Sequence, residues 1–365
     1  MSVATHERDD ERRFDSTAWE VWHVDAFGGK QPLHLEPVHE GDELDRERAG
    51  IDAGCEVMRS CVRRHNTTLR PSRADRGAIC SLKHRDRHSS LRKSGPVNQP
   101  ALSVQLYAVN DQLTDDLDGT LARLSGMGLR NVEAFNFVDR AAELAEAFTR
   151  HGLAAKTGHA TFLSDELRVR GTVRPVPAQK DVLEAAQTLG LDILIDAFVS
   201  PDRWLDEEQV AATADRLNQA AERAADYGLR VGYHNHTQEF EASFGGRSAF
   251  EVFADQLRDD VTLEVDLYWA ATAEQDVPAL LSRLGDRVKA LHVKDGFPGP
   301  DPMAMTFDRT TLDQRPAGQG EVPLLDCLAA APSTEFAVIE FDHYAGDMFD
   351  GIQASVSYLN EHGVK

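Results

Sequence analysis

The sequence predicts a (β/α)8 TIM barrel, in which eight parallel strands alternate with helices. From residue 101 onward, strand-like runs and amphipathic helical patterns alternate eight times in 265 residues, close to the roughly 250 typical of such barrels. Glycines recur between a helical pattern and the next strand, as at Gly128, Gly152, Gly190 and Gly228, where a helix C-cap is expected. Polar residues gather at the ends of the strand runs, the face on which such barrels place their chemistry.

The elements follow one another regularly, and this alternation predicts parallel pairing of the strands. Strands are predicted over residues 102–107, 131–135, 153–160, 192–198, 229–236, 262–266, 288–294 and 336–342. Helices are predicted over residues 115–126, 140–151, 180–189, 207–227, 248–257, 277–284, 322–330 and 351–361. A turn is predicted at residues 244–246, before a helix.

Residues 1–100 have a different texture and are predicted to be a disordered extension of a barrel domain at 101–365. They show no sustained period of 2 or 3.6, and 59–93 is crowded with Arg, His, Ser and Thr, which bury too little apolar area to offset ordering entropy. A zinc site from Cys61, His65, Cys80, His84 and His88 is an alternative, although the spacing is irregular. Another is that an upstream start codon appends the segment to the enzyme.

Charge and hydropathy exclude several classes of function. The net charge is −22, and residues 1–100 hold 17 basic and 17 acidic residues, so the whole excess lies in 101–365. Such a surface repels nucleic acid and acidic membranes. No apolar run approaches a membrane span, the N-terminus lacks the apolar stretch of a secretory signal, and the four cysteines do not suggest a disulfide framework. We therefore expect a cytoplasmic enzyme.

Four of the strand runs carry a residue that can bind a divalent metal at or just beyond the end of the run. These residues are Glu239, Asp266, His292 and Glu340. Polar residues at such positions are hard to explain as packing, because burying them without partners is unfavourable. Carboxylates with one imidazole suit Mn²⁺ or Mg²⁺, and Co²⁺ or Zn²⁺ are also compatible.

Five motifs resemble the sugar phosphate isomerase/epimerase family, with its xylose isomerase-like TIM barrel, over about residues 101–365. They are YHNHTQEF (233–240), DLYWAA (266–271), HVKDG (292–296), AGQGEVP (317–323) and VIEFD (338–342). The resemblance implies a metal held by Glu239, Asp266, His292 and Glu340. One departure concerns the first ligand. Many members have a Glu within the fifth strand, where this chain has His234, so His234 or His236 could ligate instead of Glu239.

The resemblance also implies an isomerase or epimerase that acts on a sugar, keto-sugar or inositol derivative, a small-molecule carbohydrate. Glu239 and Glu340 would be the acid/base pair that moves a proton through an enediolate. The expected substrate-binding residues are His159, His234, His236, Lys294, Trp269 and Glu133. The histidines would hydrogen-bond substrate hydroxyls, the lysine would neutralise developing negative charge, and the tryptophan would offer an aromatic face to the sugar ring. Glu133 would add a carboxylate from the second strand.

Other interpretations stay open. Asp266 could cap a turn, His292 could be a core histidine, and Glu133 could pair with a barrel lysine or arginine. The same first step could end in elimination, which would make the protein a lyase or dehydratase of a keto-cyclitol or 3-keto-glycoside. An endonuclease IV type of repair enzyme and a metal-free carbohydrate-binding barrel are further alternatives. The sequence does not decide between a monomer and a homo-oligomer.

Overall fold

The computed structural model describes residues 99–169, 172–299 and 309–365. The predicted N-terminal extension and its cysteine and histidine zinc candidates lie outside the described residues. Eight strands of the described part form one parallel sheet in the order β1-β14-β11-β10-β7-β6-β3-β2. They are β1 (Ala101–Val104), β2 (Asn131–Ala134), β3 (Ala154–His159), β6 (Ile193–Asp196), β7 (Arg230–His234), β10 (Thr262–Asp266), β11 (Val288–Val293) and β14 (Phe336–Ile339).

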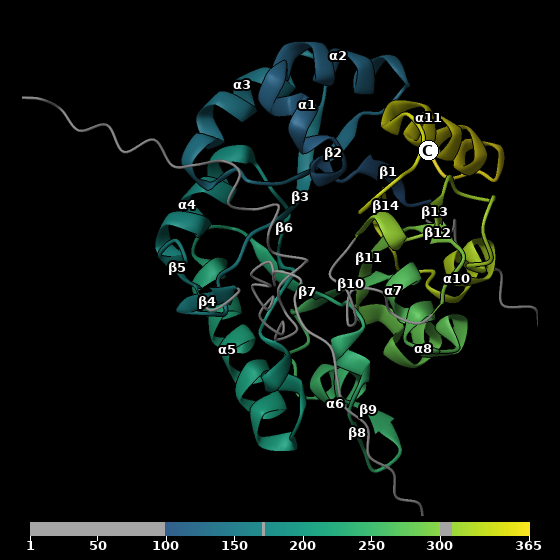
Figure 1. Ribbon diagram of the computed structural model, residues 1–365. Coiled ribbons are helices and arrows are strands. Elements are labelled where there is room, and N and C mark those ends of the chain that lie inside the picture. Colours follow the sequence, from purple (N-terminus) through teal and green to yellow (C-terminus); the bar gives the residue numbers. More distant parts are fainter. Residues whose placement is uncertain (1–98, 170–171, 300–308) are drawn as a thin grey trace, which may run out of the picture. The chain divides into compact units, whose positions relative to one another are not determined.

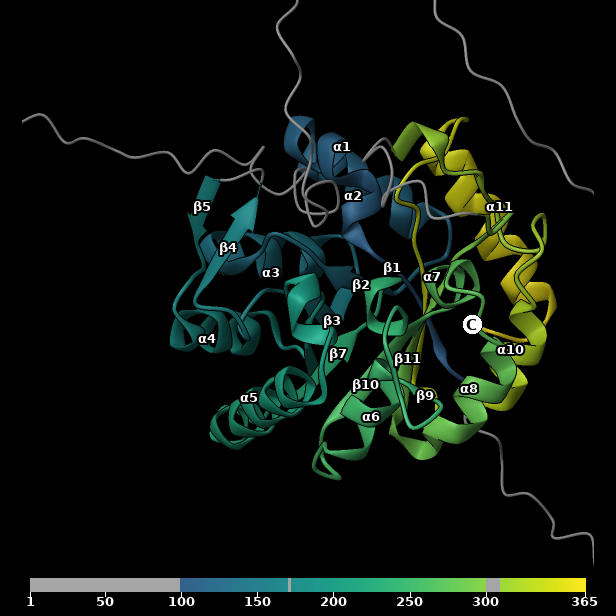
Figure 2. The same cartoon turned by 60° about the horizontal axis from the view of Figure 1, so that its bottom comes forward.

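The sheet curls into a barrel. β1 pairs with β14, the last strand of the chain, and an isolated parallel bridge between Gln105 and Glu133 joins the end of β1 to β2. Figure 1 shows the helices around these strands, and Figure 2 shows the same arrangement from a second direction. The predicted barrel and its parallel pairing are confirmed.

The main helices surround the sheet close to the positions predicted from the sequence. They are α1 (Asn110–Asp115), α2 (Leu117–Gly126), α3 (Ala141–Arg150), α4 (Gln179–Leu189), α5 (Glu207–Ala225), α6 (Ala249–Asp255), α8 (Val277–Leu284), α10 (Leu324–Ala330) and α11 (Met348–Glu361). Helix α11 starts three residues before the prediction, because Asp347 caps its first turn by accepting from the Asp350 N–H. Gly190 ends α4 in the left-handed region at φ 76°, as expected of a C-cap glycine.

Several strands end earlier than their apolar patterns predict. The strand predicted over 229–236 ends at His234, and the one predicted over 336–342 ends at Ile339. After β7, the Asn235 side chain accepts the Asp266 N–H at 3.0 Å, so a side chain takes the place of the backbone ladder. The residues beyond these strands therefore turn into the mouth of the barrel.

The barrel interior is apolar at one level and polar above it. A small apolar cluster fills the interior, made of Ile193, Ile195, Ala290, Phe336 and Val338. The larger core includes Val231, Leu263 and Leu291 together with helix residues such as Leu217 and Leu281. Toward the carboxyl ends of the strands, buried polar residues replace the apolar ones. The core thus supports a polar layer at the end of the barrel where chemistry is expected.

In the part of the chain that the structure describes, one short helix and three short hairpins follow the strands at the mouth of the barrel. They are the helix α7 (Leu267–Thr272) and the hairpins β4–β5 (Glu166–Val169 and Thr172–Pro175), β8–β9 (Ser243–Phe244 and Arg247–Ser248) and β12–β13 (Asp295–Gly296 and Gln314–Arg315). The turn predicted at 244–246 is confirmed, with Gly245 at φ 61° and Gly246 at φ 82°. None of the described helices is long and apolar enough to cross a membrane.

Asp295 organises the loop that follows β13. Its side chain is buried, and its two oxygens accept four backbone N–H groups. Oδ2 accepts from Gly318 at 2.8 Å and Gly320 at 3.1 Å, while Oδ1 accepts from Gly296 at 2.8 Å and Val322 at 3.2 Å. The AGQGEVP motif is therefore held by one carboxylate.

We predict that Asp295→Ala lowers the free energy of unfolding by about 3 kcal/mol, because it leaves four backbone N–H groups without their acceptor, and those of Gly296 and Val322 are buried. Chemical denaturation followed by circular dichroism measures the loss. Asp313→Ala is the matched control on the same hairpin, since Asp313 is half exposed and its ion pair among the described residues is with Arg315. An equal effect of the two substitutions would contradict the role of Asp295.

Candidate active site

Titratable side chains from five strands and one strand end converge inside the barrel. They are Glu133 on β2, His159 on β3, His234 on β7, Glu264 and Asp266 on β10, His292 on β11 and Glu340 just after β14. Alternate residues of a strand point to the same face, which explains why Glu264 and Asp266 both face inward. All seven side chains are buried. This is the polar layer at the barrel mouth.

The outer group consists of Asp266, His292 and Glu340, whose ligand atoms lie within 4.8 Å of one another. His292 Nδ1 is 2.6 Å from Glu340 Oε2 and 3.7 Å from Asp266 Oδ2. The structure thus brings together three of the four predicted metal ligands. Asp266 also accepts the Trp269 N–H at 2.9 Å through its other oxygen, so it caps α7 as well.

Lys294 lies between the two carboxylates of the outer group and a third carboxylate, that of Asp342. Its Nζ is 2.9 Å from Asp266 Oδ2, 2.8 Å from Glu340 Oε2 and 2.8 Å from Asp342 Oδ2. Burial acts to lower the pKa of Lys294, but the three carboxylates outweigh it and raise that pKa well above its ordinary value. Burial acts to raise the pKa of Glu340, and Lys294 with His292 holds it well below its ordinary value. Lys294 is therefore a fixed cation beside an ionised Glu340.

His234 faces the same group from β7. Its Nε2 lies 3.8 Å from Asp266 Oδ2, and its Nδ1 lies 3.1 Å from Glu264 Oε2. Burial, and then the neighbouring His292, lowers the pKa of His234 to about 4. The ring is therefore neutral near pH 7. With Nδ1–H donated to Glu264, its Nε2 keeps a lone pair that points toward the outer group.

The inner group consists of Glu133, His159, Glu264 and the Nε2 side of His292. Glu264 lies at its centre and is a residue that the sequence analysis did not single out. Its Oε2 is 2.6 Å from His159 Nε2 and 3.1 Å from His292 Nε2, and His159, His234, Glu264 and His292 form a second cluster of ligand atoms within 4.8 Å. Glu133 pairs with His292 and accepts from Gln105 at 2.7 Å, rather than pairing with a lysine or arginine. Period-2 spacing from Asp266 was the signal that could have identified Glu264.

Glu239 lies in the short 3₁₀ helix Gln238–Phe240 after β7 and belongs to neither group. Its carboxylate accepts from Tyr233 Oη at 2.7 Å and from the His236 N–H at 2.8 Å. Burial raises the pKa of Glu239 to about 7, against the lowering effect of these donors. Glu239, the predicted first ligand, therefore stabilises the loop that carries His236.

His236 and Trp269 lie next to each other beside the outer group. Their ring centroids are 6.1 Å apart, and the His236 and His234 centroids are 5.1 Å apart. Lys294 Nζ is 5.8 Å from the centre of the Trp269 ring. The predicted substrate contacts His234, His236, Lys294 and Trp269 thus share one region, whereas His159 and Glu133 lie in the inner group.

The chemistry of the outer group fits a divalent metal ion. Asp266, Glu340 and Asp342 bring three carboxylates around a single ammonium, and buried negative charge of this kind requires a cation. His234 supplies a neutral nitrogen donor. Burial acts to lower the pKa of His292, but Glu264, Glu340 and Glu133 raise it well above its ordinary value, so His292 would release a proton when a metal binds. Oxygen and imidazole donors together suit Mn²⁺, Co²⁺ and Zn²⁺.

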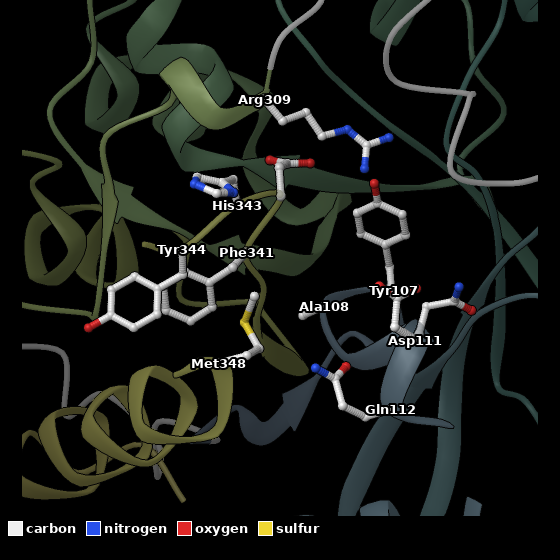
Figure 3. A pocket seen from close by; sticks show the side chains of 11 residues that line it. Tyr107, Ala108, Asp111, Gln112, Arg309, Phe341, His343, Tyr344 and Met348 are labelled. Atoms are coloured by element: carbon white, nitrogen blue, oxygen red, sulfur yellow. The ribbon is translucent and has the colours of Figure 1, made fainter. Parts of the chain in front are cut away.

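A pocket of about 180 Å³ borders the outer group (Figure 3). Asp342, which contacts Lys294, is part of its wall. In Figure 3, Tyr107, Asp111 and Gln112 face Phe341, His343 and Tyr344 across the pocket, with Arg309 beside Tyr107. Aromatic rings alternate with amides, carboxylates and a guanidinium along the wall, which is a lining that suits a polyol.

The comparisons with known proteins agree with this architecture. A family model described as xylose isomerase-like TIM barrel matches residues 121–362. Among solved structures, a sugar phosphate isomerase/epimerase from Parabacteroides distasonis is 20% identical, with 73% of this chain and 96% of that chain covered and a TM-score of 0.56. Among proteins with curated descriptions, none matches this sequence.

Two further solved structures share the fold. The probable 3-DHS dehydratase AsbF, involved in petrobactin synthesis in Bacillus anthracis, is 12% identical, with 71% of this chain and 98% of that chain covered and a TM-score of 0.54. The IOLI protein with a binding zinc atom is 17% identical, with 71% and 97% covered and a TM-score of 0.53. At these identities the likeness establishes the fold.

We predict that Glu239→Gln changes the pH dependence of stability. The folded protein holds the Glu239 proton up to about pH 7, whereas the unfolded chain releases it near its ordinary value of 4.5. The contribution of this group is therefore fully present below pH 4.5 and is lost as the pH rises through 7. The unfolding free energy of the variant minus that of the wild type should grow by about 3 kcal/mol across this range. Denaturant titrations at several pH values measure the difference, and a constant difference would contradict the burial effect.

Proposed function

The chain belongs to the xylose isomerase-like TIM barrel family, and we propose that it is a divalent-metal-dependent isomerase or epimerase of a sugar, keto-sugar or inositol derivative. The observation that carries the proposal is the outer group of Asp266, His292 and Glu340 with Lys294 at the barrel mouth. A solved structure of the same fold is named a sugar phosphate isomerase/epimerase, which supports this reaction class.

His234, Asp266, His292 and Glu340 would hold the metal, with His234 in place of Glu239. Their donor atoms are His234 Nε2, a carboxylate oxygen of each acid, and His292 Nδ1, which already lies against Glu340 and near Asp266. A bound divalent metal supplies polarisation of a substrate carbonyl and so acidifies the neighbouring C–H. Two imidazoles favour Mn²⁺, Co²⁺ or Zn²⁺ over Mg²⁺, and the IOLI structure of this fold holds zinc.

Glu340 would be the carboxylate that moves the proton. It is ionised, because Lys294 and His292 hold its pKa low against burial, so it can accept a proton from the carbon next to the carbonyl. Returning that proton to the adjacent carbon, while the hydroxyl proton passes from one oxygen of the enediolate to the other, isomerises the substrate. Lys294 would donate a hydrogen bond to the substrate oxygen that gains negative charge.

The remainder of the substrate would occupy the pocket of Figure 3. His236 and Trp269 flank the outer group, so that an imidazole and an aromatic face can contact the reacting end of a polyol. Tyr107, Gln112 and Tyr344 would contact its far end.

A lyase or dehydratase acting on a keto-cyclitol or 3-keto-glycoside is the second candidate. Elimination begins with the same proton removal and differs only in whether a leaving group sits beta to the resulting carbanion. A solved structure of this fold is named a probable dehydratase, which favours keeping this candidate.

A product assay separates the two candidates. The purified full chain is incubated with keto-sugars, keto-inositols and 3-keto-glycosides, and the products are followed by NMR in D₂O. Deuterium at the carbon next to the carbonyl, together with an isomer or epimer, is the expected result. Loss of water or aglycone would instead identify a lyase. Removal of metal with a chelator should abolish turnover, and re-addition of Mn²⁺, Co²⁺ or Zn²⁺ should restore it. Full activity of the metal-free protein would contradict the proposal.

We predict that Glu340→Gln lowers kcat by about 10²–10⁴-fold, because an amide cannot accept the proton. Steady-state kinetics measure the loss, and metal analysis of the variant shows whether the metal is retained. Glu335→Gln is the matched control, since Glu335 is a partly exposed acid that pairs with Arg230 and Lys289. Turnover of Glu340→Gln near that of the control would remove Glu340 from the proton transfer.

A further inference from the structure

Four ligand atoms of the inner group form a closed ring in which nitrogen and oxygen alternate. His159 Nε2 is 2.6 Å from Glu264 Oε2 and 3.1 Å from Glu133 Oε1. His292 Nε2 is 2.7 Å from the same Glu133 oxygen and 3.1 Å from the same Glu264 oxygen. Each nitrogen therefore faces two oxygens, and each oxygen faces two nitrogens.

Hydrogen bonding alone explains this ring poorly. Glu133 Oε1 also accepts from Gln105, and Glu264 Oε2 also faces His234 Nδ1 at 3.1 Å, so three nitrogens crowd each of these oxygens. The other oxygens, Glu133 Oε2 and Glu264 Oε1, are buried without a hydrogen-bond partner among the described residues. A carboxylate satisfied by hydrogen bonds would spread its donors over both oxygens, which together have about four acceptor sites.

The geometry points to a second metal site, distinct from the outer group, in which His159, His292, Glu133 and Glu264 bind a divalent transition-metal ion such as Zn²⁺. Zinc bonds to imidazole and carboxylate are roughly 2.0–2.1 Å long, and the ligand atoms of a tetrahedral site lie about 3.3 Å apart, so a small outward movement of these four atoms would admit the ion. The unpartnered oxygens of Glu133 and Glu264 are free to turn toward the same ion. Two imidazoles and two carboxylates form a donor set typical of such ions.

Charge supports the same conclusion. Glu133 and Glu264 are fully buried, and their ion pairs among the described residues are with histidines. Lys294 is already surrounded by Asp266, Glu340 and Asp342. A single ion in the outer group would leave the two inner carboxylates to be balanced by protons on imidazoles alone. A divalent ion in the ring neutralises both.

His292 would link the two sites. Its Nε2 belongs to the inner ring, while its Nδ1 faces Glu340 and Asp266 of the outer group. With both sites filled, each nitrogen of His292 would bind one ion, and its imidazole would carry no proton on nitrogen. The inference goes beyond the proposed function, which requires only the outer ion.

Zinc stoichiometry of the full chain tests this inference. The purified protein is stripped with a chelator, reloaded with Zn²⁺, freed of excess metal by gel filtration and analysed by mass spectrometry. We expect about two zinc ions per chain for the wild type and about one for His159→Asn, which lacks an inner ligand. Asp266→Asn should also hold about one, because it lacks an outer ligand. His151→Asn is the matched control with about two, since His151 lies outside the barrel and pairs with Asp118.

Anomalous diffraction of wild-type crystals at the zinc edge locates the ions without relying on a variant that could fail to fold. A peak between His159 and His292 is expected. A single ion at Asp266, His292 and Glu340, with the same content in His159→Asn as in the wild type, would overturn the second site and leave the proposed function intact. A single ion that is lost in His159→Asn and kept in Asp266→Asn would instead contradict the outer metal of the proposed function.

Discussion

Buried negative charge is the constraint on which the rest of this barrel depends. Five carboxylates lie at the barrel mouth, and the ammonium of Lys294 contacts three of them, those of Asp266, Glu340 and Asp342. The other two belong to Glu133 and Glu264. Unpaired charges in a dry interior are strongly unfavourable, so each carboxylate must have a cation or a donor. The imidazoles of His159, His234 and His292 lie between these acids for that reason. Metal binding would complete the same balance.

The fold supplies what such a site requires. Parallel strands in a closed ring direct the ends of β2, β3, β7, β10, β11 and β14 to one mouth, and the helices around them hold the strands in place. The apolar cluster around Ile193 and Phe336 fills the barrel interior next to the charged layer and packs against it. Loops at the mouth, such as the one fixed by Asp295, can then differ in sequence without moving the charged layer.

The two nitrogens of each imidazole ring connect the outer group at the mouth to the carboxylates of the inner group. His234 presents Nδ1 to Glu264 and Nε2 to Asp266, and His292 presents Nε2 to Glu133 and Nδ1 to Glu340. Inner carboxylates therefore fix which nitrogen of each ring faces outward, an arrangement that metal sites commonly use to orient their histidines. Reactivity at the mouth thus depends on residues that do not touch the substrate.

The sequence by itself determined the barrel, its parallel order and three residues of the outer group, because alternating strand and helix patterns and polar residues at strand ends are local signals. Asp266, His292 and Glu340 lie on or next to predicted strands, and the ring closure brings them together. Only the tertiary structure decided the fourth position. Glu239 turns into a loop to accept bonds from Tyr233 and the His236 backbone, while His234 faces Asp266. The place of Glu264 in the site likewise became evident only from its contacts with three histidines on other strands. Contacts between residues distant in sequence leave no local pattern.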